Sequence, residues 1–500
     1  MTATPATTPG GFLLVLAVLL PAGGVLLSFV LGGRAAGKIA LGLTPVGFGL
    51  ACLVAMKVTA AGAPIAYAIG GLPPPLGIAL RADGVSAVMM VAAAIIVAAS
   101  AFYARAKFVM PEGAPESRGA LTFWIMIQAI WAALNLIFVG GDLFNLYVAL
   151  ELLTFAAVPL VCIDGRPETL RAALRYLLFA LFGSVSYLLG VALLYGLYGA
   201  LDISLLAQRV EAAPMVWTAA ALMTAGLLAK TALFPLHLWL PPAHANAPAA
   251  ASAVLSGLVV KGSFFLALRL WFYVLPGLPT AAPSVVLGAL GALAVLFGSV
   301  LALRQARLKL LVAYSTVAQI GYLFFVFPLA AGAHVWSPLG WSGGLMQVLA
   351  HAFAKAAMFL AAGLVAEALG HDRIAGFTGA ARALPLTFLT LGLGGLSLMG
   401  LPPSGGFEAK WLMLRASAAS GQWLWSLPIL GGGLLAGGYV YRILAPALAD
   451  GEVEIKARPQ RSREAVALGL AVLALALAFA PRGFFDFLEI GRPSVSRSAP

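Results

Sequence analysis

The sequence is poor in cysteine and in charged residues. Cys52 and Cys162 are the only cysteines among 500 residues, and both fall in apolar runs. They predict neither a disulfide framework nor a metal site, and we interpret them as small buried hydrophobic side chains. Charged residues make up 10% of the chain, compared with about 25% in a typical soluble protein, and 62% of the residues are hydrophobic. This composition predicts a protein that crosses a lipid bilayer many times.

Signatures of cofactor chemistry are also missing. The sequence contains no Walker loop, no dinucleotide-binding fingerprint in a βαβ context, no haem or iron–sulfur signature and no nucleophile triad. We therefore expect no cofactor and no catalytic redox centre in this chain. The net charge of +12 comes from residues that are spread among short loops. Because a nucleic-acid surface needs a clustered basic patch, no nucleic-acid partner is expected.

Apolar runs recur along the whole chain. A bilayer-crossing helix needs about 20 such residues. Runs of this kind lie at 11–31, 41–61, 83–104, 120–139, 143–163, 173–198, 214–233, 249–274, 283–303, 310–329, 343–367, 384–402, 406–444 and 464–481. The run at 406–444 is too long for one crossing, so it holds the rest of a broken helix and one further span. We predict an all-α polytopic membrane protein with about 14 transmembrane helices, the first retained rather than cleaved as a signal peptide.

The positions of lysine and arginine predict the orientation of these helices. The loops 62–80, 140–142, 275–282 and 330–341 contain neither residue. The alternate loops contain Arg34, Lys38, Arg105, Lys107, Arg118, Arg166, Arg171, Arg175, Arg304, Arg307, Lys309, Arg373, Arg382, Lys456, Arg458, Arg461 and Arg463. By the positive-inside rule the basic loops are cytoplasmic, so both termini face the periplasmic side of a bacterial inner membrane.

Two segments interrupt the apolar pattern at membrane depth. The stretch 230–242 reads KTALFPLHLWLPP, and the stretch 400–410 reads GLPPSGGFEAK. A helix break inside a bilayer is tolerated only where protein or a wet cavity satisfies the freed backbone groups. Paired breaks in two halves of a chain are typical of inverted-repeat transporters, whose active groups lie near the breaks.

Few ionisable residues fall inside the predicted spans or at the breaks. A charge at the bilayer centre costs about 2.5–3.5 kcal/mol, so four lysines facing lipid would cost on the order of 10–14 kcal/mol. We therefore expect these side chains to face the interior of the bundle. Burial lowers the pKa of a lysine and a nearby carboxylate raises it, which suits such groups to proton transfer. The candidates are Glu151, Lys230, Lys261, His351, Lys355, Glu408, Lys410 and, at the first break, His237.

Each candidate has a plainer interpretation. Glu151 can form a static ion pair with a lysine of a neighbouring helix instead of belonging to a proton path. Lys230 and Lys261 can extend towards a membrane interface, although Lys261 lies deep in its span. His237 can structure the break rather than relay protons, and the loop that it shares with His244 lacks further metal ligands. No metal site is expected.

The remaining candidates lie in two short motifs. His351 and Lys355 are spaced i and i+4 in HAFAK, so they share one helix face and their titrations are coupled. Glu408 and Lys410 are two residues apart and point to different faces of a helix. We expect Lys410 to face the path and Glu408 to be more peripheral.

Five blocks of the sequence resemble a known family when they are taken together and in order. They are DLFNLYVALELLTF, AKTALFPLHLWLPPAHANAPAAASAVLSGLVVKGSFF, RLKLLVAYSTVAQIGY, LAHAFAKAAMFL and GLPPSGGFEAKW. The set is similar to the antiporter-like proton-translocating subunits of Mrp-type cation/proton antiporters, respiratory complex I and membrane-bound hydrogenases. The DLFNLYV block and the stretch GIALRADGVSA resemble the D-type subunits of the Mrp-type Na⁺/H⁺ antiporters most closely.

The resemblance implies two inverted five-helix repeats with broken helices near 230–242 and 400–410. We therefore divide the chain into N-terminal helices (1–119), a first repeat (120–275), a second repeat (283–445) and a cytoplasmic loop, last helix and tail (446–500). The resemblance also implies that Glu151 and Lys230 form a proton-modulating pair that controls Lys261. His351, Lys355 and Lys410 would continue the path, with His237 and Glu408 as further relay candidates.

The implied function is proton translocation within a multi-subunit membrane complex, most like a Na⁺/H⁺ antiporter. Its partners are other membrane subunits, the lipid bilayer and protons, with sodium transport left open. One alternative is a pumping subunit of an NADH:quinone oxidoreductase-like or hydrogenase complex. A stand-alone carrier of an organic solute is disfavoured because few hydrogen-bonding side chains surround the breaks. A structural subunit that retains the fold without pumping is a further alternative.

Overall fold

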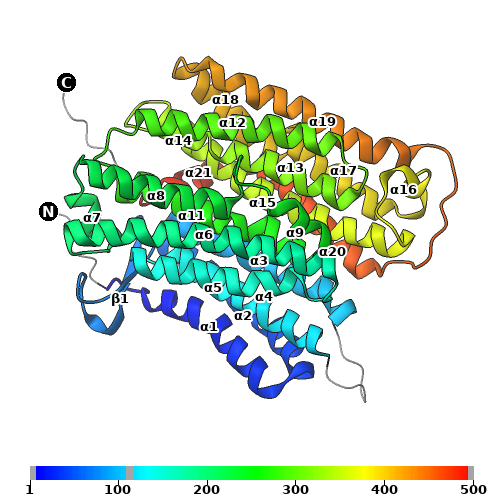
Figure 1. The fold of residues 1–500 in the computed structure, drawn as a ribbon, viewed down its shortest axis with the longest axis horizontal. Coiled ribbons are helices and arrows are strands. Elements are labelled where there is room, and N and C mark those ends of the chain that lie inside the picture. The colour runs from blue at the N-terminus through cyan, green and yellow to red at the C-terminus, as the bar shows by residue number, and fades with distance from the viewer. Residues whose placement is uncertain (1–6, 109–116, 494–500) are drawn as a thin grey trace.

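The computed structural model describes residues 7–108 and 117–493 as a bundle of roughly parallel helix axes (Figure 1). Within this part of the chain, 12 helical segments are long and apolar enough to cross a membrane. They are Phe12–Leu31 (α1), Gly33–Ala61 (α2), Gly84–Phe108 (α3), Arg118–Val139 (α4), Leu143–Val161 (α5), Pro167–Tyr198 (α6), Ala249–Val274 (α10 to η3), Ala281–Leu303 (α12), Leu308–Ala330 (α13 and α14), Ser337–Leu369 (α15), Trp423–Leu448 (η5 and α19) and Arg461–Phe479 (α20 and η6). The prediction of a helical polytopic membrane protein is confirmed.

Shorter helices complete the bundle. They are α7 (Ile203–Arg209), α8 (Pro214–Thr231), α9 (Leu240–Asn246), α16 (Ala380–Ala383), α17 (Pro385–Met399), α18 (Gly405–Ala419) and α21 (Arg482–Glu489), with single 3₁₀ turns η1 (Ile69–Gly71) and η4 (Ile374–Gly376). Two predicted spans, 214–233 and 384–402, are not among the 12 long segments. The helix α8 corresponds to the first, and α17, followed by α18, corresponds to the second. The total of fourteen crossings and the inverted repeats stay predictions.

Both predicted helix breaks are confirmed. The helix α8 ends at Thr231, and Ala232 then adopts a left-handed conformation with a φ of 59°. The helix α17 ends at Met399, and Gly400 follows with a φ of 80°. Prolines come next in both places, and a proline cannot continue the hydrogen-bond ladder of the preceding helix. Each break therefore leaves carbonyl oxygens at a helix end inside the bundle.

The segment Ala249–Val274 is one continuous span with two irregular turns. It consists of α10 (Ala249–Val254), a π-helical turn η2 (Leu255–Val259), α11 (Val260–Arg269) and a second π-helical turn η3 (Leu270–Val274). Nearly all of its residues are buried, and so is most of the long helix α15. These two elements form the core around which the other helices pack (Figure 1).

Close helix packing brings α8 against α6 near the first break. A Cβ atom added at Gly226 would lie 2.2 Å from the carbonyl oxygen of Gly183, and one added at Gly183 would lie 3.0 Å from Cγ of Lys230. Small residues of this kind let the backbones of membrane helices approach closely. The contact sets the distance of Lys230 from the neighbouring helices.

A short hairpin was not predicted. The strands β1 (Ile65–Ala68) and β2 (Ala79–Ala82) pair antiparallel, with Ile65 opposite Ala82. Residues near both ends of the described chain lie close to this hairpin. Thr8 donates its backbone N–H to the Ala66 carbonyl, and Ile490 accepts a hydrogen bond from the Gly84 N–H, 3.1 Å away. The first and last described segments therefore lie at the same end of the bundle.

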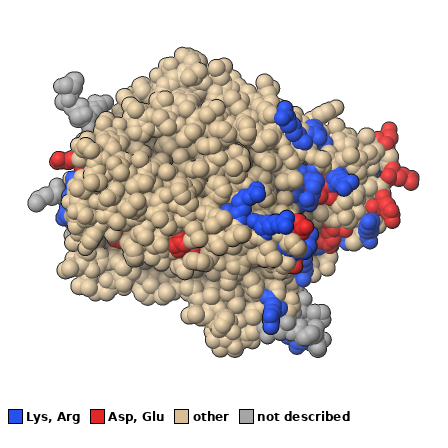
Figure 2. All heavy atoms as spheres, viewed as in Figure 1, with Lys and Arg blue, Asp and Glu red and all other residues tan. Residues whose placement is uncertain are grey.

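Basic side chains gather at the opposite end. Figure 2 shows most of the visible lysines and arginines in the right-hand half of the view and few in the left-hand half, which is mostly uncharged. A few lie elsewhere, such as Arg209 at the end of α7. The broad uncharged band matches the hydrocarbon layer that a membrane protein faces.

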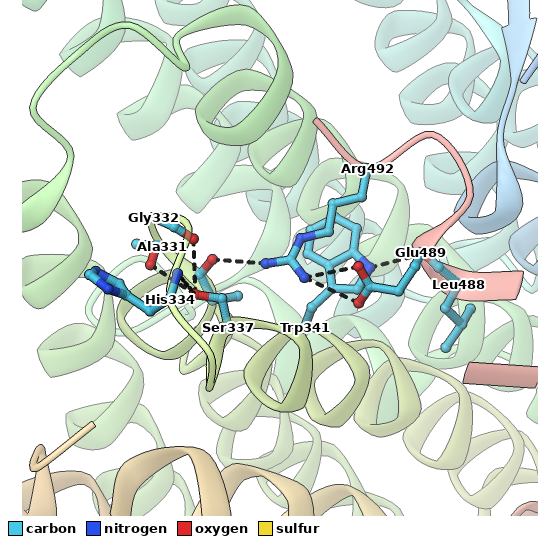
Figure 3. Close-up of polar contacts among 9 residues, drawn as sticks. Ala331, Gly332, His334, Ser337, Trp341, Leu488, Glu489 and Arg492 are labelled. Carbon is cyan, nitrogen blue, oxygen red and sulfur yellow. Dashed lines mark hydrogen bonds and ion pairs between the residues drawn. The ribbon is translucent and has the colours of Figure 1, made fainter. Parts of the chain in front are cut away.

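The C-terminal segment crosses the start of α15 and is fixed there (Figure 3). Arg492 forms an ion pair with Glu489 at 3.0 Å, donates to the carbonyl of Ala330 at 3.2 Å and lies over the ring of Trp341. The Trp341 indole N–H donates to the Leu488 carbonyl at 3.0 Å. We call Leu488, Glu489, Arg492 and Trp341 the C-terminal clamp.

Candidate functional site

Glu151 and Lys230 lie together, although α5 and α8 are far apart in sequence. The Nζ atom of Lys230 is 3.6 Å from Oε1 of Glu151, and both side chains are mostly buried. Lys230 also donates to Oγ1 of Thr154 at 2.8 Å and to the Leu150 carbonyl at 3.2 Å. The ammonium group is therefore held by one carboxylate and two neutral oxygens of α5.

A hydroxyl contact joins the helix that holds Lys230 to the helix that holds the next lysine along the chain. Thr231, which follows Lys230, donates through Oγ1 to Oγ of Ser263 at 2.9 Å. Ser263 lies two residues after Lys261 on α11, and Lys261 is completely buried. Lys261 donates to the Ser256 carbonyl in the π-helical turn η2. π-Bulges occur frequently at functional sites, and this one turns a main-chain oxygen towards the lysine.

His351 and Lys355 lie on one face of α15 and both are buried. Lys355 donates to the Val312 carbonyl of α13 at 3.0 Å and to Oγ of Ser315. Neither ring nitrogen of His351 has a hydrogen-bond partner among the described residues. The three groups Lys261, His351 and Lys355 lie within electrostatic range of one another.

Hydroxyl groups connect Lys261 with Lys355 across the core. The side-chain oxygens of Ser256 and Thr316 are 3.0 Å apart. Thr316 donates to the Val312 carbonyl at 3.0 Å, and Lys355 donates to the same oxygen. The residue that accepts from Lys261 is thus linked by a continuous run of polar atoms to Lys355.

Lys410 lies at the second break. Its Nζ atom donates to the carbonyls of Leu398 and Met399 at 2.7 and 3.0 Å, and lies 4.4 Å from the ring centre of Tyr322. These carbonyls are at the C-terminal end of α17, where helix carbonyls lack partners and carry partial negative charge. Lys410 is 5% exposed, whereas Glu408 is half-buried on another face of α18.

The lysines differ in their counter-charges. Within residues 7–108 and 117–493, no carboxylate oxygen lies within 4 Å of Lys261, Lys355 or Lys410, while Lys230 has Glu151. Carbonyl and hydroxyl oxygens alone hold the other three ammonium groups. An unpaired charge in a low-dielectric interior is costly, so these positions suit groups that exchange a proton rather than hold a permanent charge.

The two histidines of the first break are both buried. His237 packs against Phe234 and Phe297, and its Nδ1 atom has no partner among the described residues. The ring of His244 stacks on Phe359 with centroids 4.8 Å apart. His244 is also within electrostatic range of Lys309, Lys355 and Lys261, which places it nearer to the central lysines than His237. In the described part of the chain, no group of three or more His, Cys, Asp or Glu residues is arranged to hold a metal ion.

A cavity of about 830 Å³ opens at the basic end of the bundle. Its lining includes ion pairs between Arg307 and Asp372 and between Arg463 and Glu367. Lys309 also lines it and donates to the Ala247 carbonyl at 2.6 Å. The cavity therefore reaches the backbone immediately after the helix that holds His244.

Comparison with known proteins agrees with this geometry. The profile of the family described as "NADH:quinone oxidoreductase/Mrp antiporter, TM" matches residues 140–435. The chain belongs to this antiporter-like family. NADH-quinone oxidoreductase subunit N of Desulforudis audaxviator (strain MP104C) is 35% identical over 404 residues, which are 80% of this chain and 78% of that protein. The Na(+)/H(+) antiporter D-type subunit of Alkalihalophilus pseudofirmus is 27% identical over 370 residues, covering 73% of this chain and 72% of that protein.

The fold agrees as well. A chain of the Mrp complex from Dietzia sp. DQ12-45-1b has a TM-score of 0.86, with 96% of each chain covered and 22% identity. The resemblance to the antiporter-like family that the five sequence blocks predicted is confirmed. Relatives of both the antiporter type and the redox-linked type are found at similar coverage.

Sequence reasoning missed several polar residues of this antiporter-like core. Gln319 of α13 and Gln347 of α15 are buried and bonded to each other. Asp83 and Arg269 form a buried pair of hydrogen bonds, one of them 2.8 Å long, between the start of α3 and α11. Arg269 lies inside the predicted span 249–274, so its charge could have identified it as a candidate functional residue. The glutamines carry no charge, and only the spacing i and i+4 from Gln347 to His351 pointed to one of them.

Proposed function

We propose that this chain translocates protons across the membrane as one subunit of a multi-subunit cation/proton antiporter. The observation that carries the proposal is the largely buried set Glu151, Lys230, Lys261, His351, Lys355 and Lys410, in which Glu151 is paired with Lys230 and hydroxyl and carbonyl oxygens connect Lys261 with Lys355. Placing charged groups inside the bilayer costs free energy, and the few that occur there usually mark a transport path.

The pair Glu151 and Lys230 acts as the control element. Two unit charges about 4 Å apart interact by about 4 kcal/mol at an effective dielectric constant of about 20. When Glu151 is protonated or moves away from Lys230, the positive charge of Lys230 is no longer compensated. Lys261 then experiences a net positive neighbour and releases its proton towards His351 and Lys355 more readily. Re-formation of the ion pair allows Lys261 to be loaded again.

The cavity at the basic end is the proposed cytoplasmic access. The positive-inside rule assigns this end to the cytoplasm, and the contacts of Thr8 and Ile490 with the opposite end support periplasmic termini. Residues 1 and 500 themselves lie outside the described residues. Lys309 lines the cavity, and His244 is within electrostatic range of Lys309 and of the central lysines Lys261 and Lys355. In this proposal protons enter there and leave beyond Lys410. His237 and Glu408 are accessory relay groups in this proposal.

Proton transport by the complex in proteoliposomes tests the proposal. Lys230→Met and Lys261→Met each remove an amine while keeping an unbranched apolar side chain of similar length. We expect both variants to assemble and to lose transport, whereas the matched control Lys38→Met, at an exposed position, transports normally. Normal transport by both variants would overturn the proton path.

A second candidate function is a proton-pumping subunit of a redox complex. The 35% identity to NADH-quinone oxidoreductase subunit N favours it, and the same lysine path would then be driven by electron transfer in partner subunits. The proteins that copurify with a tag on this chain distinguish the two. Small membrane proteins alone would identify an antiporter, while flavin or iron–sulfur proteins would identify a redox complex. In both cases the complex is located in a bacterial inner membrane.

A further inference from the structure

Two buried glutamines bridge the part of the route that lies between His351 and Lys410. On α15, Gln347 precedes His351 by one helical turn and Lys355 by two. On α13, Gln319 lies between this face of α15 and the C-terminal end of α17. The two side chains are 1% and 2% exposed, with Gln319 the more buried. They occupy the space between the central groups and Lys410.

The amides form one polarised hydrogen-bond chain. Gln347 donates through Nε2 to Oε1 of Gln319 at 2.9 Å. Gln319 donates through Nε2 to the Leu398 carbonyl at 3.1 Å and to the Tyr439 hydroxyl at 3.4 Å. The Leu398 carbonyl also accepts from Lys410 at 2.7 Å. The amide donors of these hydrogen bonds therefore point along the series from Gln347 towards the Leu398 carbonyl that Lys410 also contacts, and Oε1 of Gln319 accepts from the α15 side.

Buried polar atoms without hydrogen-bond partners lie at both ends of this series of hydrogen-bonded amides. Oε1 of Gln347 and both ring nitrogens of His351 take no hydrogen bond from the described residues, and neither does Oγ of Ser397. Nearly all buried polar atoms in native proteins are hydrogen-bonded, to protein or to ordered water. A water needs two to four polar partners. The atoms of Gln347 and His351 provide three on one side of the amide pair, and Oγ of Ser397, next to Leu398, offers one on the other side.

We propose that Gln319 and Gln347 are positioning residues that orient the water molecules carrying protons from His351 to Lys410. The amides neither gain nor lose a proton. A proton released on the His351 side passes along waters that lie beside the amide pair and hydrogen-bond to it, and it then binds Nζ of Lys410, which is neutral beforehand and becomes an ammonium group. The fixed direction of the amide donors favours one alignment of these waters. The inference rests on the proposed function, because it names the step that delivers protons to Lys410.

Isosteric substitution in the intact complex tests this role. Gln319→Met and Gln347→Met keep the length of the side chain but remove its hydrogen bonds. We expect each to lower proton transport in proteoliposomes about tenfold, the effect of losing a buried hydrogen bond at the limiting step. The ratio of rates in H₂O and D₂O should rise, since proton transfer through the bridge becomes limiting, and a merely loosened bundle would not raise it.

Two comparisons make the result decisive. Gln128→Met is the matched control, because Gln128 is also a buried glutamine, bonded to Ser28 and to the Trp124 carbonyl on α4. It should transport at the normal rate with an unchanged isotope ratio. Gln319→Met combined with Gln347→Met should be about as slow as either variant alone, because the two amides act as one hydrogen-bonded unit.

The outcomes separate this inference from the proposed function. If Lys410→Met abolishes transport while both glutamine variants transport normally, the glutamine bridge is wrong and the lysine path stands. If Lys410→Met, Lys230→Met and Lys261→Met all transport normally, the proposed function itself fails. Slow transport with an unchanged isotope ratio would assign the glutamines a structural role only and would also overturn the inference.

Discussion

At the scale of single residues, hydroxyl groups help to hold two of the buried lysines, Lys230 and Lys355. Thr154 accepts from Lys230 at 2.8 Å and itself donates to the Leu150 carbonyl at 2.9 Å. Ser315 has the same place beside Lys355, and Ser256 and Thr316 connect the two halves of the core. These residues have no charge, so they look ordinary in an apolar sequence. Their role follows from the ammonium groups that they contact.

Thr154→Val should therefore weaken the Glu151 and Lys230 pair without breaking it. A hydrogen bond to a charged group contributes about 1.5–3 kcal/mol, and valine keeps the shape of threonine. We expect proton transport to fall about tenfold or more, and Thr154→Ser to restore most of it. Thr218→Val is the control, since Thr218 is an exposed residue of α8 bonded only to the Pro214 carbonyl. Equal transport by Thr154→Val and the wild type would show that the hydroxyl is dispensable.

At the scale of elements, the second helix break creates the site where Lys410 binds carbonyl oxygens, and the first break ends α8 one residue after Lys230. Ala232 is the only residue other than glycine with a positive φ among those described, and it is fully buried. The left-handed conformation costs a residue with a Cβ atom roughly 1–2 kcal/mol. The surrounding packing holds it there, immediately after Lys230 and Thr231.

This geometry predicts opposite effects of two substitutions at Ala232. Ala232→Val places a β-branched side chain at a positive φ and overpacks a buried site, which should destabilise the protein by about 2 kcal/mol or more. Ala232→Gly removes the conformational cost and should leave stability within about 1 kcal/mol of the wild type. Thermal unfolding of the purified protein in detergent measures the difference. A melting temperature that is unchanged by valine would contradict the left-handed conformation.

At the scale of the whole molecule, the C-terminal clamp fixes the last described segment to the start of α15 (Figure 3). Burial raises the pKa of the Glu489 carboxyl above its ordinary value of 4.5, and this effect exceeds the opposing influence of Arg492, while Asp486 raises the pKa further. The folded clamp therefore binds a proton more tightly than the unfolded segment does. By linkage, its stability is greatest below the unfolded pKa and falls as the pH rises through the folded pKa.

We thus expect the clamp to open more readily at neutral pH than at about pH 4–5. Hydrogen exchange at Gly84, whose N–H donates to the Ile490 carbonyl, reports this opening once it is corrected for the intrinsic exchange rate. Glu489→Gln should flatten the pH dependence, because the amide does not ionise. A clamp that becomes more stable as the pH rises would show that the ion pair with Arg492 outweighs burial.

The sequence by itself determined the class of the protein and the chemistry it can carry. Low charge and repeated apolar runs require a helical membrane protein, because only internally bonded backbone is stable in lipid. The positions of the prolines predicted both helix breaks. The free-energy cost of burying a charge in the bilayer identified Glu151, the four lysines and His351 as candidates. These properties depend on local composition and on spacing along one helix, which a sequence shows directly.

Only the tertiary structure decided how these groups are connected. The approach of Lys230 to Glu151, the hydroxyl link from Ser256 to Thr316 and the glutamine pair all join helices that are distant in sequence. Such contacts depend on helix rotation and on close approach at residues such as Gly226, which periodicity does not specify. Uncharged hydrogen-bonding residues gain their role only when packing places them beside a buried charge.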